Sequence, residues 1–282
     1  MHLATAVLTH GEQAVVVDDA LGAAPVRDLV PDAPDDTLAV LSTVPLEQLR
    51  AAVREADPAV WRPLEGLRLT APYRRPRKLW GIGLNYVEHA GDLSEVVPDE
   101  PASFVKGDHT IIGPGDPIPL PRQSDRVTAE GELGLVIGRE CYDVSEDDAL
   151  SYVWGVTTVL DQTAEDILAR NPRFLTRSKN FPGFFSFGPR LVPLDEVLGA
   201  DGTLSDVEVA TVLNGGVHRQ NTVSNMRYSP QFLVSFHSQV MPLFPGDIIS
   251  TGTPGAAVIT DGDVAECRIP GVGVLSNPVV RR

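Results

Sequence analysis

Acidic residues beside apolar segments are the most informative feature of this sequence. Glu130 and Glu132 are separated by one glycine and precede the apolar run 133–137. In a β-strand, residues i and i+2 point to the same face, so the two carboxylates project together. Two acids at the mouth of a buried strand repel each other, unless the strand end is solvated or a hard divalent cation is bound. The pair alone leaves both interpretations open.

Asp161 favours the metal interpretation. It closes a second apolar stretch, residues 154–160, which also has the composition of a strand. Two strands that each deliver carboxylate to one edge can supply three oxygen ligands, and water or substrate would fill the remaining positions. We therefore predict that Glu130, Glu132 and Asp161 bind a divalent cation, for which Mg²⁺, Mn²⁺ and Ca²⁺ are suitable because they prefer oxygen ligands.

His89 and Asp92 form a second candidate group. They are three residues apart, so one helical turn would place them side by side. A carboxylate that holds one imidazole nitrogen raises the basicity of the other, as a general base that activates water requires. The alternative is a surface histidine on a polar turn, and the spacing alone favours that alternative.

Two lysines and one turn complete the candidates. Lys106 lies in SFVKGD and Lys179 in TRSKNFPGFF, both apolar or glycine-rich stretches. A cation near a metal can bind a substrate carboxylate or stabilise an enolate, although most lysines are simply solvated. The turn Thr-Gly-Thr-Pro at 251–254 follows a predicted strand, and its amides and hydroxyls could bind an oxygen-rich ligand. Such turns are frequent in proteins, so this indication is weak.

Composition restricts the partners. The 282 residues carry a formal net charge of −15, which repels phosphate backbones and anionic lipid surfaces, so neither nucleic acid nor membrane is expected as a partner. No window approaches 18 uninterrupted apolar residues, and the first residues lack the pattern of a secretory leader. The two cysteines lack metal-knuckle spacing and suit a reducing compartment. We therefore expect a cytoplasmic protein.

Several common catalytic motifs are absent from the sequence. Gly81 and Gly83 resemble the start of a dinucleotide fingerprint, but Tyr86 stands where its third glycine would be. The sequence contains no GxxxxGK[ST], HExxH or GxSxG pattern. Nucleotide-driven chemistry, zinc proteolysis and the usual serine hydrolase are therefore disfavoured.

The elements that would position these residues divide into two parts. Residues 1–72 are predicted to form a small N-terminal α+β domain, and residues 73–282 a catalytic domain rich in short strands. The high glycine and proline content, 25 and 24 residues, is typical of strands and turns rather than a helix bundle. The patterns predict a hairpin turning near His10 and Gly11, strands over 130–140 and 154–161, and helices over 44–57, 145–152, 163–170 and 229–241.

Seven segments in order make the chain resemble the fumarylacetoacetate hydrolase superfamily over about residues 78–280. They are GIGLNYVEHA, FVKGDHTIIGPGDPI, EGELGLVIG, GVTTVLDQTAED, RSKNF, LNGG and GDIISTGTPGAA. The resemblance implies an α+β, mainly β fold: a mixed β-roll with a small N-terminal α+β domain, usually as a homodimer. It also implies a site for Mg²⁺, Mn²⁺ or Ca²⁺ formed by Glu130, Glu132 and Asp161.

The resemblance assigns roles to further residues. A flexible lid would carry the dyad of His89 and Asp92, with Asp in place of the more usual Glu. The family lysine falls on Lys179, and the Gly-Thr pair that binds substrate through its backbone falls on Gly252 and Thr253.

One stretch departs from the family pattern. Many members read T-A-R-D-[LIV]-Q after the metal aspartate, whereas this chain has Glu165 and Leu168 at the arginine and glutamine positions. The metal ligands and the dyad are unaffected, but the resemblance no longer fixes the substrate specificity. If Glu165 faces the pocket it would disfavour an acid group nearby, unless it pairs with Arg170 or Arg173.

The activity implied is hydrolysis of a carbon–carbon bond in a β-dicarbonyl 2-oxo acid of the acylpyruvate or fumarylpyruvate type. His89, oriented by Asp92, would deprotonate the attacking water, Lys179 would stabilise the enolate, and Lys106 would help Gly252 and Thr253 to bind the oxo-acid substrate. The alternative is a lyase or isomerase on the same scaffold, such as an oxaloacetate decarboxylase, hydratase or tautomerase, because all these reactions pass through an enolate. A non-catalytic ligand-binding member is a third possibility.

Overall fold

The N-terminal segment forms a small sheet covered by helices. The computed structural model describes residues 1–86 and 99–281. Its first strands and helices are β1 (His2–Leu8), β2 (Gly11–Asp18), β3 (Gly22–Pro25), α1 (Val26–Leu29), α2 (Thr37–Thr43) and α3 (Leu46–Glu55). β1 and β2 pair antiparallel from His2 opposite Val17 to Leu8 opposite Gly11, which confirms the predicted hairpin. Leu49 of α3 is fully buried, as expected for the apolar side of the predicted helix.

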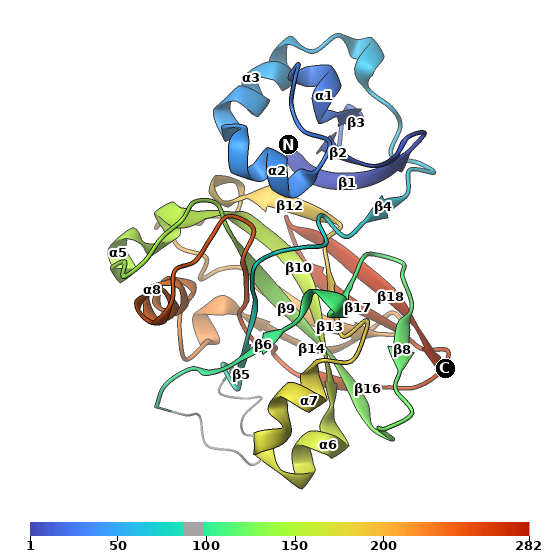
Figure 1. Ribbon diagram of the computed structural model, residues 1–282, viewed down its shortest axis with the longest axis vertical. Helices are drawn as coiled ribbons and strands as arrows, with labels where there is room; N and C mark the ends of the chain where they lie inside the picture. Colours follow the sequence, from blue (N-terminus) through green and yellow to red (C-terminus); the bar gives the residue numbers. More distant parts are fainter. Residues whose placement is uncertain (87–98, 282) are drawn as a thin grey trace.

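The centre of the molecule is one long antiparallel pair, β9 (Val127–Ile137) and β10 (Val153–Ala164). Both strands were predicted from their apolar runs. They belong to a sheet of 13 of the described strands, which includes β1, β2 and β3 and continues below the N-terminal helices (Figure 1). The sheet also includes β4 (Leu69–Thr70), β5 (Leu79–Gly83), β6 (Ala102–Lys106), β7 (Ile111–Ile112), β11 (Phe185–Phe187), β12 (Arg190–Pro193), β15 (Ile248–Ser250) and β16 (Ala256–Ile259).

A second sheet packs against one face of this pair. Its order is β14 (Gly216–Thr222), β13 (Glu208–Leu213), β17 (Val264–Ile269), β18 (Gly273–Arg281) and β8 (Ile118–Leu120). Leu133 and Leu160 of the first sheet share a fully buried apolar cluster with Cys267 and Leu275 of the second. The two mixed sheets confirm the predicted mainly β, α+β class.

The opposite face of β9 and β10 supports the N-terminal segment. Val136 and Val159 lie in one buried cluster with Leu3 and Val16, and β1 pairs directly with β12. Hydrophobic packing and a strand ladder therefore join the first 70 residues to the large sheet. The division of the chain at residue 72 stays a prediction.

Helices flank the large sheet at its ends. The predicted helix over 229–241 is α8 (Pro230–Val240), and the hydroxyl of Ser229 caps it by accepting a hydrogen bond from the Phe232 amide at 3.1 Å. The stretches 145–152 and 163–170 contain α5 (Glu146–Ala149) and α6 (Glu165–Arg170), and α7 (Leu175–Lys179) follows beside α6 (Figure 1). Among the described residues, no helix has the length and apolar character needed to cross a membrane.

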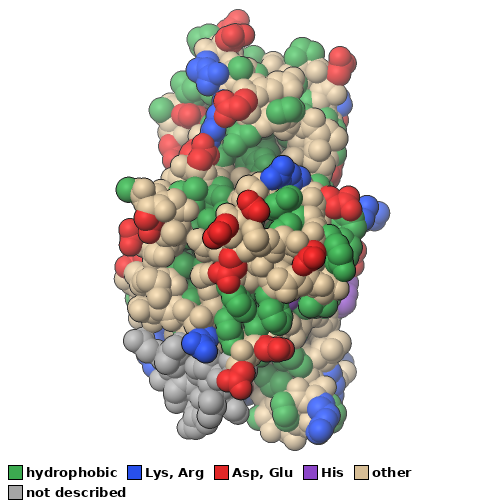
Figure 2. All heavy atoms as spheres, turned by 90° about the vertical axis from the view of Figure 1, so that its left-hand side faces the viewer, with side chains coloured by type: hydrophobic (Ala, Val, Ile, Leu, Met, Phe, Trp, Pro, Cys, Tyr) green, Lys and Arg blue, Asp and Glu red, His purple; other side chains and the backbone are tan. Residues whose placement is uncertain are grey.

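The acidic excess is visible on the surface. The face drawn in Figure 2 shows more Asp and Glu than Lys and Arg side chains, spread among apolar and neutral ones. Such a surface repels small anions at a distance, so an anionic substrate requires a site with its own positive charge.

The contact between β10 and β12 gives a test of the fold. A Cβ at Gly155 would lie 2.0 Å from the backbone oxygen of Val192, so the strands would have to separate. We expect Gly155→Ala to lower the free energy of unfolding by about 1–3 kcal/mol. The matched control is Gly216→Ala, where the nearest atom would be 3.6 Å away. Urea denaturation measures both, and equal effects of the two substitutions would contradict the β10–β12 packing.

Candidate active site

Register places the three predicted acids on one face of the large sheet. In the β9–β10 ladder Glu130 lies opposite Asp161 and Glu132 opposite Val159, so alternation directs all three carboxylates to the same side. One carboxylate oxygen from each can be chosen so that the three lie within 4.8 Å of one another. Glu132 and Asp161 are each only 1% exposed. The structure thus brings together the acids that the sequence analysis selected.

Two lysines reach the same carboxylates from other elements. Lys179, at the end of α7, places its Nζ 2.6 Å from Oδ2 of Asp161 and 3.2 Å from Oε2 of Glu130. Lys106, at the end of β6, forms an ion pair with Oδ1 of Asp161. Both ammonium groups are buried, so each Asp161 oxygen faces a positive charge in a water-poor environment.

The two lysines differ in how many of their donors are used. Lys106 also donates to the backbone oxygens of Gln162, at 2.9 Å, and Phe184. Its contact with Oδ1 of Asp161 is an ion pair in addition to these two hydrogen bonds. Lys179 has two partners among the described residues, Asp161 and Glu130, which leaves one N–H for another acceptor.

Among the described residues, the charges of the cluster are unbalanced. Three carboxylates face two ammonium groups, and burial followed by repulsion from Asp161 and Glu130 raises the pKa of Glu132 to about 8. Burial also lowers the pKa of Lys106 to about 8, although Asp161 opposes this shift. For Lys179, burial lowers the pKa, but attraction to Asp161 and Glu130 outweighs it and the pKa is raised. A divalent cation would relieve the repulsion that acts on Glu132.

The donor set fits such a cation. Three carboxylates from two rigid, hydrogen-bonded strands are hard oxygen donors, the kind that Mg²⁺, Mn²⁺ and Ca²⁺ prefer. Three protein ligands also leave coordination positions for water or substrate. Glu130, Glu132 and Asp161 are therefore the residues that would hold the ion.

The turn after β15 orients Glu132. Its Oε2 accepts hydrogen bonds from the Gly252 amide, at 3.0 Å, and from the Ser250 hydroxyl. Gly252 has φ +100°, and a Cβ there would lie 2.9 Å from Cβ of Asn85. Both the backbone conformation and the close contact therefore require glycine at this position. The hydroxyl of Thr253 donates to the Gly255 oxygen at 3.1 Å. Both groups thus have internal partners here, and the predicted binding of substrate by Gly252 and Thr253 stays a prediction.

Asn85 fixes this turn in place, and sequence reasoning missed it. Its Nδ2 donates to the backbone oxygens of Thr251, at 2.8 Å, and Tyr228, at 3.0 Å, while its Oδ1 accepts from the Tyr228 amide at 2.9 Å. The side chain is 1% exposed. Its partners lie 143 and 166 residues away, so no local pattern could reveal them; Ser250 was missed for the same reason.

The predicted dyad of His89 and Asp92 lies outside the described residues. The structure describes the chain up to Tyr86 and again from Asp99. The role of the two residues stays a prediction.

Glu165, which departs from the family pattern, pairs with a residue that the sequence analysis did not consider. Glu165 pairs with Nε of Arg126, whereas Arg170 pairs with Asp166 at 3.5 Å. Of the alternatives raised from the sequence, pairing of Glu165 with Arg170 or Arg173 is not what the structure shows. The Glu165 amide also donates to the Arg126 oxygen at 2.9 Å, just past Ala164 and Val127, the last pair of the β9–β10 ladder.

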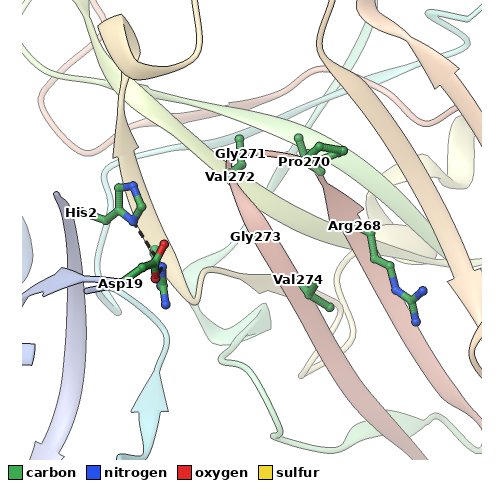
Figure 3. Close-up of a pocket in the computed structure, with 10 residues that line it drawn as sticks. His2, Asp19, Arg268, Pro270, Gly271, Val272, Gly273 and Val274 are labelled. Carbon is green, nitrogen blue, oxygen red and sulfur yellow. Dashed lines mark hydrogen bonds and ion pairs between the residues drawn. The ribbon is translucent and has the colours of Figure 1, made fainter. Parts of the chain in front are cut away.

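A separate hollow of about 380 Å³ lies between the N-terminal strands and the β17–β18 turn. Figure 3 shows His2 and Asp19 on one side of it and Arg268 and Val274 on the other. Its arginines are paired with carboxylates, Arg190 with Asp19 at 2.6 Å and Arg268 with Glu266. None of its residues belongs to the acid cluster, and we assign it no catalytic role.

Comparison with known proteins identifies relatives of this architecture. Residues 78–280 match the family model described as fumarylacetoacetate (FAA) hydrolase C-terminal. The chain is 34% identical to oxaloacetate tautomerase FAHD2A, mitochondrial, from Homo sapiens over 260 residues, which cover 87% of this chain and 82% of the relative.

Solved structures show the same fold along the whole chain. A 5-carboxymethyl-2-hydroxymuconate delta-isomerase from Mycobacterium smegmatis is 33% identical, with a TM-score of 0.78 and coverage of 100% of this chain and 99% of that one. A maleylpyruvate hydrolase from Sphingobium sp. SYK-6, solved with manganese(II) and pyruvate, is 27% identical, with a TM-score of 0.82 and the same coverage.

Metal binding can be tested without substrate. We expect Mn²⁺ at about 100 times its Kd to stabilise the protein by roughly 2.7 kcal/mol, which raises the melting temperature by several degrees. Glu132→Gln should abolish the shift. Its metal-free melting temperature should not fall, because the amide keeps an acceptor for Gly252 and cannot ionise beside Asp161 and Glu130. Glu146→Gln, at an exposed acid, is the control. An unchanged shift in Glu132→Gln would contradict the proposed ligand set.

Proposed function

Because the chain belongs to the fumarylacetoacetate hydrolase family, we propose that it is a divalent-metal-dependent enzyme that hydrolyses a carbon–carbon bond in a 2-oxo acid of the acylpyruvate type. The observation that carries the proposal is the buried cluster of Glu130, Glu132 and Asp161 with two lysines. A homodimer with a small oxo-acid as its substrate is part of the same proposal.

Charge favours an anionic substrate at this cluster. When ionised, three carboxylates, two ammonium groups and one divalent cation carry a single net positive charge, which matches one substrate carboxylate. The surface outside the site is acidic, with a formal charge of −15 for the chain. The cluster therefore provides the local positive charge that a 2-oxo acid requires.

A bound cation would supply Lewis-acid polarisation of the substrate's carbonyl oxygen. Lys179 is the side chain suited to the oxygen on which negative charge develops, since one of its N–H groups has no acceptor among the described residues. Lys106 donates to two backbone oxygens and forms an ion pair with Asp161, so we assign it to holding Asp161 and the strand ends rather than to direct contact with substrate.

The remaining step requires a base. In the proposed reaction His89, oriented by Asp92, removes a proton from water, which attacks the distal carbonyl carbon. The carbon–carbon bond then breaks, its electron pair forms the enolate of pyruvate, and protonation at carbon gives pyruvate and a carboxylic acid. Both residues lie outside the described residues, and family likeness supports their role.

Tautomerisation is the second candidate. The human relative at 34% identity is named an oxaloacetate tautomerase, and a Mycobacterium smegmatis structure at 33% identity is named an isomerase. Such reactions also require an enolate stabilised by a cation and a lysine, but no attacking water. The products therefore separate the two candidates.

The experiment is incubation with an acylpyruvate and, separately, with oxaloacetate in the presence of Mn²⁺. Hydrolysis predicts pyruvate plus a second acid; decarboxylation releases CO₂; tautomerisation changes only the enol absorbance. We expect hydrolysis of the acylpyruvate, and at least a hundredfold loss in His89→Ala with Mn²⁺ binding retained. No reaction with either compound, or full activity of His89→Ala, would contradict the proposal.

A further inference from the structure

One side of the Lys179 ammonium group faces an aromatic ring. Nζ of Lys179 lies over the ring of Phe104, 4.5 Å from its centroid. Both residues are buried, with 5% and 7% exposure. A cation within about 6 Å of an aromatic face is attracted by the negative charge above the ring, most strongly where water is excluded. The ring is therefore a third neighbour of an ammonium group that also contacts Asp161 and Glu130.

Gly81 makes room for this ring. In the β5–β6 ladder Gly81 lies directly opposite Phe104. A Cβ at position 81 would lie 2.3 Å from two ring atoms of Phe104, so any larger residue would displace the ring. Gly81, which begins no dinucleotide fingerprint, thus provides the space in which an aromatic side chain packs beside the acid cluster.

Strand β6 presents two side chains to the cluster. Phe104 and Lys106 are two residues apart and both buried, whereas Val105 between them is 45% exposed. Alternation along the strand thus places the ring that contacts Lys179 on the same face as the ammonium group that pairs with Asp161.

Asn180 holds α7 against β6. It follows Lys179 directly at the end of the helix. Its Oδ1 accepts a hydrogen bond from the Gly107 amide at 2.8 Å, and its Nδ2 donates to the Val105 oxygen at 3.1 Å. Both partners belong to, or directly follow, the strand that carries Phe104. The ammonium group and the ring therefore come from two backbone segments that are bonded to each other.

A ring face stabilises a cation without taking the place of a hydrogen-bond acceptor. An oxygen at this position would bind an N–H group of Lys179, as two backbone oxygens do for Lys106. Phe104 instead restricts where the Lys179 ammonium group lies and leaves its remaining N–H for an oxygen of the substrate.

We infer that Phe104, packed on Gly81, is a positioning residue that holds the Lys179 ammonium group where it stabilises negative charge on the substrate. The catalytic part of this inference rests on the proposed function, whereas the contact between ring and ammonium group does not. Without the attraction of the ring, the ammonium group moves from this position, which lowers kcat more than it changes KM.

NMR of the lysine side chains tests the contact without substrate. The chain contains three lysines, Lys78, Lys106 and Lys179, so protein made with lysine carrying ¹³C at Cε gives few signals. Lys179→Met identifies the signal of Lys179 by its loss. Because protons above an aromatic face are shifted upfield, Phe104→Leu should move the Lys179 signal downfield and leave that of Lys78 in place.

Phe187→Leu is the matched control. Phe187 is a fully buried phenylalanine whose ring packs against Tyr73 at 5.0 Å, and among the described residues no lysine or arginine lies over it. The substitution removes a buried ring of equal size, so it should lower stability but leave the Lys179 signal in place.

Kinetics with an acylpyruvate and Mn²⁺ test the positioning role. We expect Phe104→Leu to lower kcat by about tenfold and to change KM by less than about twofold. Trifluorophenylalanine at position 104 keeps a ring over Gly81 but withdraws negative charge from its face, so we expect roughly a threefold loss in kcat. Phe187→Leu should keep the wild-type kcat.

An unchanged Lys179 signal in Phe104→Leu would overturn the inference, because the ring would then not lie against the ammonium group. Equal losses of kcat in Phe104→Leu and Phe187→Leu, or a wild-type kcat in both variants of Phe104, would also overturn it and leave the proposed function standing. If wild-type protein converts neither an acylpyruvate nor oxaloacetate, the proposed function and the catalytic part of the inference fail, and the Lys179 signal still decides the contact.

Discussion

The convergence of three carboxylates on one face of an antiparallel strand pair is the constraint on which the rest of the site depends. Register sets it: Glu130 opposes Asp161, and Glu132 follows on the same face. Burial of these acids costs free energy unless opposite charges and hydrogen bonds compensate for the lost water. Two buried lysines, two threonine hydroxyls and the Gly252 amide provide part of that compensation. Among the described residues the carboxylates outnumber the ammonium groups by one, and a divalent cation would turn this excess into a single positive charge.

The acids repel one another, so side chains and backbone groups from several neighbouring elements are needed to hold them in place. The turn after β15 holds Glu132, and Asn85 holds that turn through Thr251. Lys106 joins Asp161 to two backbone oxygens at the strand ends. Each contact keeps a carboxylate in a place that electrostatics alone would not favour. The site is therefore a preorganised cluster in which the fold opposes charge repulsion.

Local sequence patterns predicted those parts of the structure that depend on periodicity. Alternation of period two selected Glu130 and Glu132, the end of an apolar run selected Asp161, and the residue pattern over 229–241 predicted α8. Asn85, Ser250 and Arg126 escaped because their partners are distant in sequence and meet only through sheet order. Glu165 was noticed as a departure, but its partner lies just past the end of the ladder rather than along the helix. Spacing and apolar surroundings gave only weak indications for the dyad and for Lys179, and the family resemblance assigned their roles.

Anomalous diffraction from crystals grown with Mn²⁺ tests the central claim most directly. The account predicts one strong manganese peak within about 2.0–2.6 Å of oxygens from Glu130, Glu132 and Asp161. Those three residues should supply its protein ligands, and the other positions should be open to water or an oxo-acid. A manganese ion bound elsewhere at saturating concentration, with the three acids held only by Lys106 and Lys179, would contradict it.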